Sequence, residues 1–141
     1  MATVSTAAAH WEGSLMEGSG TVDLVTSGVG HFDVNWAKRA DAGKGITNPE
    51  ELIAAAHSTC YSMALSHALA GNGTPAESLD TKAEVGFQPG VGITGSTLTV
   101  TGKVPGLTEE QFTAFAEEAK TGCPVSSALS IPITLHVTFE S

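Results

Sequence analysis

The chain has 141 residues, which is enough for one domain with one hydrophobic core, spanning residues 1–141. Its formal net charge of −9, with only six Lys and Arg, excludes the basic surface that nucleic acids and anionic membranes require, so we expect neither partner. No apolar run approaches the roughly 20 residues that span a bilayer, and the N-terminus does not resemble a secretory signal. We therefore expect a cytoplasmic protein, whose cysteines are reduced, metal-bound or redox-active rather than permanently bridged.

Strands are predicted in the first third of the chain. Residues 8–16 and 21–26 flank a turn at residues 17–20 that contains two glycines. Residues 31–36 alternate between polar and apolar side chains, which is typical of a half-buried strand. A polar loop with two further glycines is predicted for residues 38–47.

A long helix is predicted to follow this loop. Asn48 is a good N-cap, Pro49 suits the first helical position, and the glycines on either side of Asn72 provide a stop signal. The helix is apolar on nearly all sides, which indicates that it is buried. A domain of this size cannot easily enclose such a helix, so the pattern also favours a homodimer.

The second half of the chain alternates strands and helices. We predict two alternating strands joined by a hairpin at Gly90 and Gly92, a helix opened by a capping box, a short helical turn and a final strand. Their respective residues are 79–87, 98–104, 108–122, 123–129 and 133–139. The predicted order is three strands, a long buried helix, two strands, two helices and a strand, which is an α+β fold.

The two cysteines are the first candidates for chemistry. Cys60 lies in the middle of the long helix, about 15 Å from its start. Cys123 is placed where a helix begins, with Pro124 at the first helical position, and unpaired backbone N–H groups there can lower the pKa of a thiol. Their separation of 63 residues fits no CxxC or zinc pattern. By position alone, each could also be a small buried hydrophobic residue.

Charged residues near the helix start are further candidates. Arg39 is the only arginine, so its guanidinium is a candidate for a bidentate carboxylate pair or for stabilising a thiolate, although a solvated surface charge is an equal alternative. Glu51 is expected to have a structural role in capping the helix. Glu50, one residue earlier, is expected to pair with Arg39.

The histidines suggest a metal site only weakly. His57, Cys60 and His67 fall on one stripe of the long helix, but about 15 Å of helix separates the two histidines, so the three cannot bind one ion. A His57–Cys60 pair completed by outside ligands stays open as an alternative. No nucleophile elbow or phosphate-binding loop is present, and we expect neither a metal nor a cofactor.

Two segments resemble those of a known family. The runs TNPEELIAAAHSTCYSMAL, which contains Cys60, and GCPVSSAL, which contains Cys123, closely resemble the OsmC/Ohr family of hydroperoxide reductases. The similarity is greatest to the OsmC branch, the osmotically inducible protein C group. It extends across essentially the whole chain, including the segment WAKRADAGKG.

This resemblance implies a fold and a set of site residues. The implied fold is an OsmC-like α+β domain that forms an intertwined homodimer around a buried central helix. The peroxidatic cysteine of the family matches Cys60 and its resolving cysteine matches Cys123. The family's glutamate matches Glu50, and the arginine of the OsmC-like pattern matches Arg39.

The resemblance also implies a reaction that belongs to the response to oxidative and osmotic stress. Arg39, held by Glu50, would stabilise the Cys60 thiolate, which attacks a hydroperoxide and becomes a sulfenic acid. Cys123 would close a disulfide, and a lipoyl-type dithiol, such as dihydrolipoamide or a lipoylated protein, would reduce it. Organic hydroperoxides are the expected substrates, with hydrogen peroxide a weaker one.

Helix geometry adds one hypothesis about the substrate. Ile53, Ala56 and Met63 share the helix face of Cys60 and would form an apolar pocket around it. Two other interpretations remain: a small-ligand binding protein with unreactive buried thiols, and a protein with a structural disulfide between the two cysteines.

Overall fold

The computed structural model describes all 141 residues, which form two compact units, residues 1–52 and 53–141. The predicted α+β class is confirmed, and so is the predicted order of the main elements. The assignment of residues 1–141 to a single domain stays a prediction.

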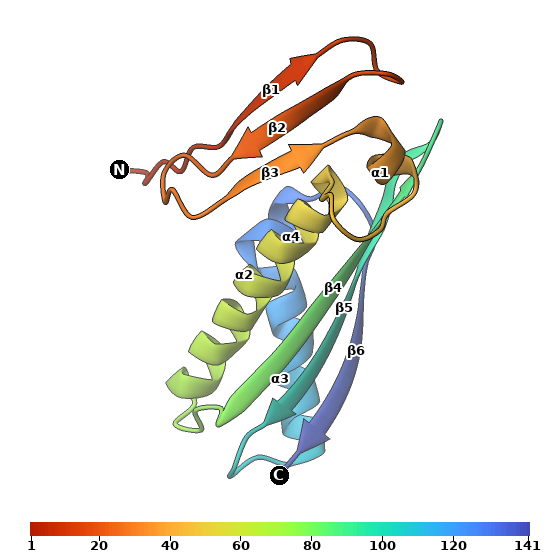
Figure 1. Ribbon diagram of the computed structural model, residues 1–141. Coiled ribbons are helices and arrows are strands. Elements are labelled where there is room, and N and C mark those ends of the chain that lie inside the picture. The colour runs from red at the N-terminus through yellow and green to blue at the C-terminus, as the bar shows by residue number, and fades with distance from the viewer. The chain divides into compact units, whose positions relative to one another are not determined.

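The first unit contains a three-stranded antiparallel sheet. Its strands follow one another in space as they do in sequence, so they form a meander (Figure 1). Their bounds are β1 (Ala8–Glu12), β2 (Ser19–Asp23) and β3 (His31–Val34).

The first strand is shorter than predicted because the turn after it begins earlier, whereas β2 begins two residues earlier than predicted and ends at Asp23. Gly13 leaves β1 with a φ of 91°, and the backbone N–H of Gly18 donates to the Ser14 carbonyl oxygen at 2.8 Å. A Cβ atom at Gly18 would lie 2.3 Å from that oxygen, so this close approach requires glycine. The turn therefore begins at residue 13, and the prediction of a turn at residues 17–20 was wrong in its bounds.

A short helix, α1 (Trp36–Ala40), replaces the end of the third predicted strand and the start of the predicted loop. The side chain of Asn35 accepts a hydrogen bond from the backbone N–H of Lys38 at 2.9 Å. This is an N-cap, and it ends the strand before residue 36. Sequence alternation pointed to a strand through Trp36, and the local cap overrode it.

The second unit is built on another three-stranded sheet. β4 (Ser78–Gln88) pairs with β5 (Gly92–Lys103) as an antiparallel hairpin, and β5 pairs with β6 (Ile133–Glu140) in parallel. The parallel pair requires a crossover, which is provided by α3 (Glu109–Gly122) and α4 (Pro124–Ala128). The capping box predicted for α3 is present at Thr108 and Gln111.

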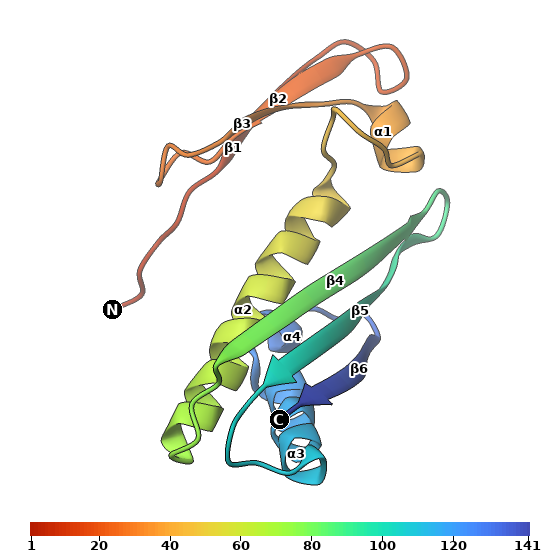
Figure 2. The ribbon, with the colours of Figure 1, turned by 60° about the horizontal axis from the view of Figure 1, so that its bottom comes forward.

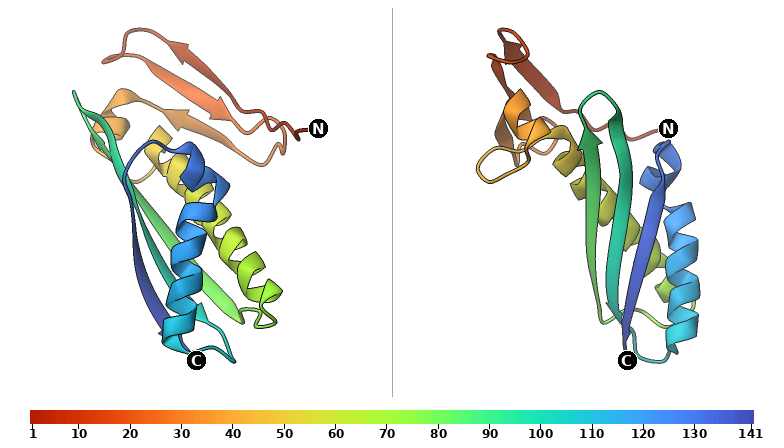
Figure 3. Two further views of the ribbon diagram at one scale, coloured as in Figure 1. Left: turned by 180° about the vertical axis from the view of Figure 1, so that it is seen from behind. Right: turned by 90° about the vertical axis from the view of Figure 1, so that its right-hand side faces the viewer.

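The helix α2 (Pro49–Gly71) begins at the predicted proline and ends at the predicted glycines. Its part in the second unit lies with α3 against one face of the sheet (Figures 2 and 3). The core between them is apolar and takes residues from α2, β5 and α3, together with Val104 and Cys123, which follow β5 and α3 in the chain. It consists of Tyr61, Leu65, Leu69, Leu98, Val100, Val104, Phe112, Ala116, Ala119 and Cys123.

In a single chain, α2 is buried along one face. The buried residues recur at every fourth position from His57 to Leu69, and the Tyr61 hydroxyl donates to the Ala116 carbonyl oxygen of α3 at 2.9 Å. The opposite face is exposed, including Met63, whose exposed fraction is 67%. None of the helices combines the length and hydropathy needed to cross a bilayer.

Candidate active site

The second unit brings the two cysteines together although 63 residues separate them. Cys60 lies midway along α2 and is half-buried, whereas Cys123 is fully buried. Both thiols are free, and they lie within hydrogen-bonding reach of each other. Two sulfur atoms in such contact can exchange a proton, and they can form a disulfide after oxidation.

Cys123 occupies the junction of two helices. Its backbone N–H donates to the Ala119 carbonyl oxygen at 2.9 Å and ends α3, while its own carbonyl oxygen accepts from the Ser127 N–H at 3.0 Å and opens α4. Pro124 stands at the start of α4, as predicted. The N–H groups of this first turn, which have no helical partner, are directed at the thiols.

These N–H groups distribute the charge unequally between the thiols. Burial raises the pKa of Cys60, and a hydrogen bond from the Val125 N–H offsets only part of that rise. Burial also acts to raise the pKa of Cys123, but it is outweighed by hydrogen bonds from the Ser126 backbone, the Cys60 thiol, the Ser126 hydroxyl and the Val125 N–H, which leave that pKa lowered. Of the two thiols, Cys123 is therefore the one that loses its proton more readily.

A buried histidine adjoins this pair, and the sequence did not mark it for this role. Nδ1 of His57 lies 2.7 Å from the Ser96 hydroxyl, and Nε2 lies 2.7 Å from the Ser126 hydroxyl. Burial lowers the pKa of His57, so the imidazole is neutral. The only sequence signal was its place three residues before Cys60; its serine partners come from β5 and α4.

The first unit forms the ion pair that the sequence suggested. Nε of Arg39 donates to Oε1 of Glu50 at 3.2 Å, and Nη2 donates to Oε2 at 3.0 Å. The Glu50 side chain is 6% exposed, so this bidentate pair provides the partner that a buried carboxylate needs.

The two neighbouring glutamates are used differently: Glu50 pairs with Arg39 as predicted, whereas the Glu51 carboxylate does not cap the helix backbone. Glu51 is exposed and accepts a hydrogen bond from the Thr47 hydroxyl at 2.5 Å, while its backbone N–H donates to the Asn48 side chain at 2.8 Å. Asn48 is thus the N-cap of α2. Glu50 points elsewhere and pairs with Arg39.

The residues proposed for a substrate pocket differ in burial. Ile53 is half-buried, whereas Ala56 and Met63 are exposed. Met63 lines an open hollow beside His67 and Leu79. The pocket hypothesis built on these three residues stays a prediction.

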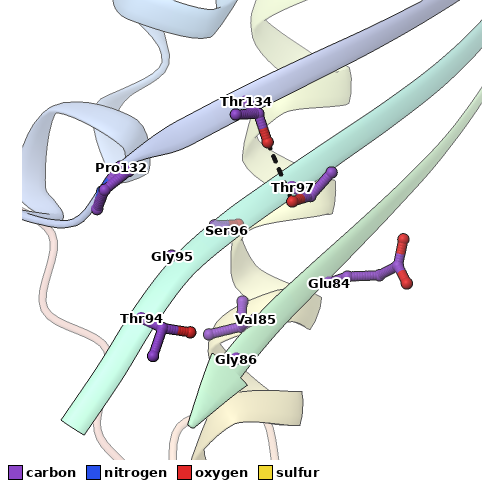
Figure 4. A pocket seen from close by; sticks show the side chains of 9 residues that line it. All are labelled: Glu84, Val85, Gly86, Thr94, Gly95, Ser96, Thr97, Pro132 and Thr134. Atoms are coloured by element: carbon purple, nitrogen blue, oxygen red, sulfur yellow. Dashed lines mark hydrogen bonds between the residues drawn. The ribbon is translucent and has the colours of Figure 1, made fainter. Parts of the chain in front are cut away.

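Two other hollows have different linings. The first unit contains one of about 250 Å³, lined mainly by apolar side chains such as Trp11, Val34 and Leu52, with Arg39 among them. The second unit contains one of about 610 Å³, with hydroxyl-bearing residues along β5 and β6 (Figure 4). There the Thr134 hydroxyl donates to that of Thr97 at 3.0 Å.

No three or more His, Cys, Asp or Glu side chains are grouped so that they could hold a metal ion. The alternative of a metal bound by His57 and Cys60 also meets a direct obstacle. Both ring nitrogens of His57 already bond serine hydroxyls, so neither is available as a ligand.

Comparison with known proteins gives consistent results. A family model described as OsmC-like protein matches residues 42–138. Proteins named Peroxiredoxin OsmC from Escherichia coli and Shigella flexneri are each 40% identical over 136 residues, covering 94% of this chain and 94% of theirs. An organic hydroperoxide resistance protein from Elizabethkingia anophelis is 28% identical with a TM-score of 0.72, covering 99% of this chain and 100% of its own. An OsmC structure from Legionella pneumophila is 23% identical with a TM-score of 0.71, covering 99% of this chain and 98% of its own.

Proposed function

Because the chain belongs to the OsmC-like protein family, we propose that it reduces organic hydroperoxides through Cys60 and Cys123. It is a peroxiredoxin-like hydroperoxide reductase, in keeping with its relatives named peroxiredoxin. The observation that carries the mechanism is the contact of two free thiols, one on α2 and one at the start of α4.

The first step oxidises Cys60. Cys60 gives up its proton, which ends on the departing alkoxide, and the resulting thiolate attacks the distal oxygen of the hydroperoxide. The O–O bond breaks, the oxygen stays on sulfur as a sulfenic acid, and the alkoxide leaves with a proton as the alcohol. The guanidinium of Arg39, oriented by Glu50, stabilises the thiolate and the departing oxygen. In a dimer, these groups can come from different subunits.

The second step closes the disulfide. Cys123 attacks the sulfur of the oxidised Cys60, and the hydroxide that leaves takes a proton and becomes water. A dithiol of lipoyl type, such as dihydrolipoamide or a lipoylated protein, then reduces the disulfide and leaves oxidised. A reducing compartment keeps both thiols available between turnovers, so we place the protein in the cytoplasm.

An apolar substrate is supported by the hollow in the first unit. Its lining is mainly apolar, with Arg39 among its residues, so a hydroperoxide could bury its tail in the hollow while its polar end meets the guanidinium. Hydrogen peroxide has no such tail, and we expect it to react more slowly.

A second copy of the chain is the proposed structural partner. The exposed face of α2 is poor in charge, and β1 is exposed along its whole length. Exposed apolar groups on a helix and an open sheet are best covered by another chain. We propose a homodimer that covers both.

The test follows the thiols through one turnover. One equivalent of cumene hydroperoxide should remove both thiols of the wild type, with the loss of two hydrogens seen by mass spectrometry. Cys123→Ser should instead accumulate a sulfenic acid, and Cys60→Ser should consume no peroxide.

Two outcomes would contradict the proposal. Consumption of peroxide by Cys60→Ser at the wild-type rate would move the chemistry to another residue. Thiols that both survive the peroxide would favour a binding protein with inert cysteines, and a bridge already present after isolation under reducing conditions would favour a structural disulfide.

A further inference from the structure

His57 is a polar side chain in an apolar core, and the proposed reaction leaves it without a task. Its exposed fraction is 0%, and its two partners, Ser96 and Ser126, are exposed by 1% and 7%. Burying an imidazole and two hydroxyls costs free energy that an apolar side chain would avoid. Such a network is tolerable when all its members are bonded, and here both ring nitrogens have a partner at 2.7 Å.

The network reaches the thiols through a single hydroxyl. Ser126 bonds Nε2 of His57 and also donates to the sulfur of Cys123. A serine hydroxyl has a single hydrogen, so when that hydrogen points to Cys123, the Ser126 oxygen must accept from an N–H at Nε2.

The rest of the network then has one consistent polarity. A neutral imidazole carries one N–H, so Nδ1 is bare and accepts from the Ser96 hydroxyl. The donors therefore run in one direction, from Ser96 through His57 and Ser126 to the sulfur of Cys123. Ser96 lies on β5 at the hollow in Figure 4, while its hydroxyl is turned into the core against His57.

We propose that His57 is a positioning residue for Cys123: its Nε2–H holds the Ser126 oxygen and thereby directs the Ser126 hydroxyl onto the Cys123 sulfur. This arrangement keeps Cys123 ready to attack the oxidised Cys60. The inference rests on the proposed function for the reaction it serves, but the hydrogen-bonded chain exists in the reduced protein without any substrate.

The step that benefits is closure of the disulfide. Cys123 sulfur forms a bond to Cys60 sulfur, the Cys60 S–O bond breaks, and hydroxide leaves. Cys60 is reduced from the sulfenic level to the disulfide level while Cys123 is oxidised to it, and the proton lost by Cys123 ends on the departing oxygen as water. The hydroxyl of Ser126 stabilises the Cys123 thiolate that performs this attack.

Few other titratable groups face the thiol pair. Tyr61 of α2 interacts with the charge of Cys123, and Glu117 of α3 acts on Tyr61. Burial raises the pKa of Tyr61, and its hydroxyl is occupied by the Ala116 carbonyl oxygen, so it stays neutral where Cys123 titrates. A change in the titration of Cys123 can thus be assigned to its hydrogen bonds.

The first measurement needs no peroxide. In a Cys60→Ser background, Cys123 is the only thiol, and its titration can be followed by the pH dependence of its alkylation with iodoacetamide. Ser126→Ala and His57→Leu should each raise the midpoint by about one pH unit, because a hydrogen bond to the thiolate is lost. His57→Gln keeps an N–H donor for Ser126, so its alkylation midpoint should lie close to that of the protein with His57.

The matched control is Ser62→Ala. Ser62 is a partly buried serine of α2, and its hydroxyl bonds Thr81 of β4 at 2.8 Å, away from this chain of hydroxyls. The Ser62→Ala variant should leave the midpoint of Cys123 alkylation unchanged. Equal shifts in Ser62→Ala and Ser126→Ala, or none in Ser126→Ala, would overturn the positioning role, and Ser126→Ala decides the matter even where His57→Leu fails to fold.

The second measurement tests the consequence for the reaction. With both cysteines present, disulfide closure after a single addition of cumene hydroperoxide should slow about tenfold in Ser126→Ala, since the thiolate fraction falls tenfold per unit of pKa. Formation of the sulfenic acid should change far less. If Cys123→Ser forms no sulfenic acid, the proposed function fails while the alkylation result stands; if closure is equally fast in Ser126→Ala, the positioning role fails alone.

Discussion

The guanidinium of Arg39 meets the carboxylate of Glu50 with two nitrogens, at 3.2 and 3.0 Å. A lysine ammonium cannot form this parallel pair, because it is a point charge on a flexible stem. The pair fixes the plane of the guanidinium, and in the proposed mechanism this fixed plane orients the peroxide for attack.

Arg39→Lys tests this geometry while keeping the charge. We expect sulfenic acid formation on Cys60 to slow by about tenfold to a hundredfold, as for the loss of a charge-assisted hydrogen bond of about 1.5–3 kcal/mol. Rapid-mixing kinetics with cumene hydroperoxide would measure this rate. Lys38→Arg, at the neighbouring position, is the control and should not change it; an unchanged rate in Arg39→Lys would remove the guanidinium from the mechanism.

The hydrogen-bond and ion-pair partners of a side chain could be predicted where they are close in sequence, and not where they are distant. The distinction between Glu50 and Glu51 followed from helix positions alone. The environment of His57 did not, because its two serine partners lie 39 and 69 residues away. No local pattern marks such contacts, since they depend on the packing of α2 against β5 and α4.

Among the elements, β5 contains a glycine where alternation calls for an apolar side chain. Gly102 faces the core, and a Cβ atom there would lie 2.2 Å from Cζ of Phe112. The Phe112 ring is fully buried and packs on that of Phe139, with centroids 5.4 Å apart. The missing side chain thus makes room for a ring of α3.

Gly102→Ala should therefore destabilise the protein. The added methyl group overfills a packed core, which costs about 1–3 kcal/mol. Urea unfolding followed by circular dichroism would measure the loss. Gly71→Ala, at the end of α2 with nothing within 4 Å of the new Cβ, is the matched control and should be neutral or slightly stabilising; equal stability of the two variants would show that Phe112 can move aside.

Elements marked by caps were predicted to within about a residue, and so were the alternating strands β4 and β6, whereas the strands of the first unit and the start of β5 were not. Asn48 and Thr108 located the starts of α2 and α3. In the first unit, the cap at Asn35 was missed, and the turn after Gly13 began earlier than the glycine pattern suggested. A single Asn within an alternating run can be a polar residue of a strand or the N-cap of a helix. Only the hydrogen bond of its side chain distinguishes the two.

On the scale of the molecule, the exposed face of α2 is the main surface left to explain. The apolar character of this helix is visible in its sequence, and it is the reason that the sequence favours both burial and a homodimer. The number of copies and their arrangement are not set by periodicity, because many contacts can cover one apolar face.

Met63→Glu places a charge on this face and should weaken the proposed dimer. Burying an unpaired carboxylate in an interface costs several kcal/mol, which would raise the dissociation constant of the dimer about a hundredfold. Sedimentation velocity over a range of concentrations would detect the shift. Val91→Glu, at a residue 68% exposed compared with 67% for Met63, is the control, and a dimer that survives both substitutions would place the interface elsewhere.

The contact of Cys60 with Cys123 also has a thermodynamic side. The proposed disulfide would close a loop of 63 residues that contains β4, β5 and α3. By loop-closure entropy, such a link restricts the unfolded chain and stabilises the fold by about 4 kcal/mol. The oxidised form, which has already turned over, would then have the larger free energy of unfolding, and each reduction would return the protein to a less stable but reactive form.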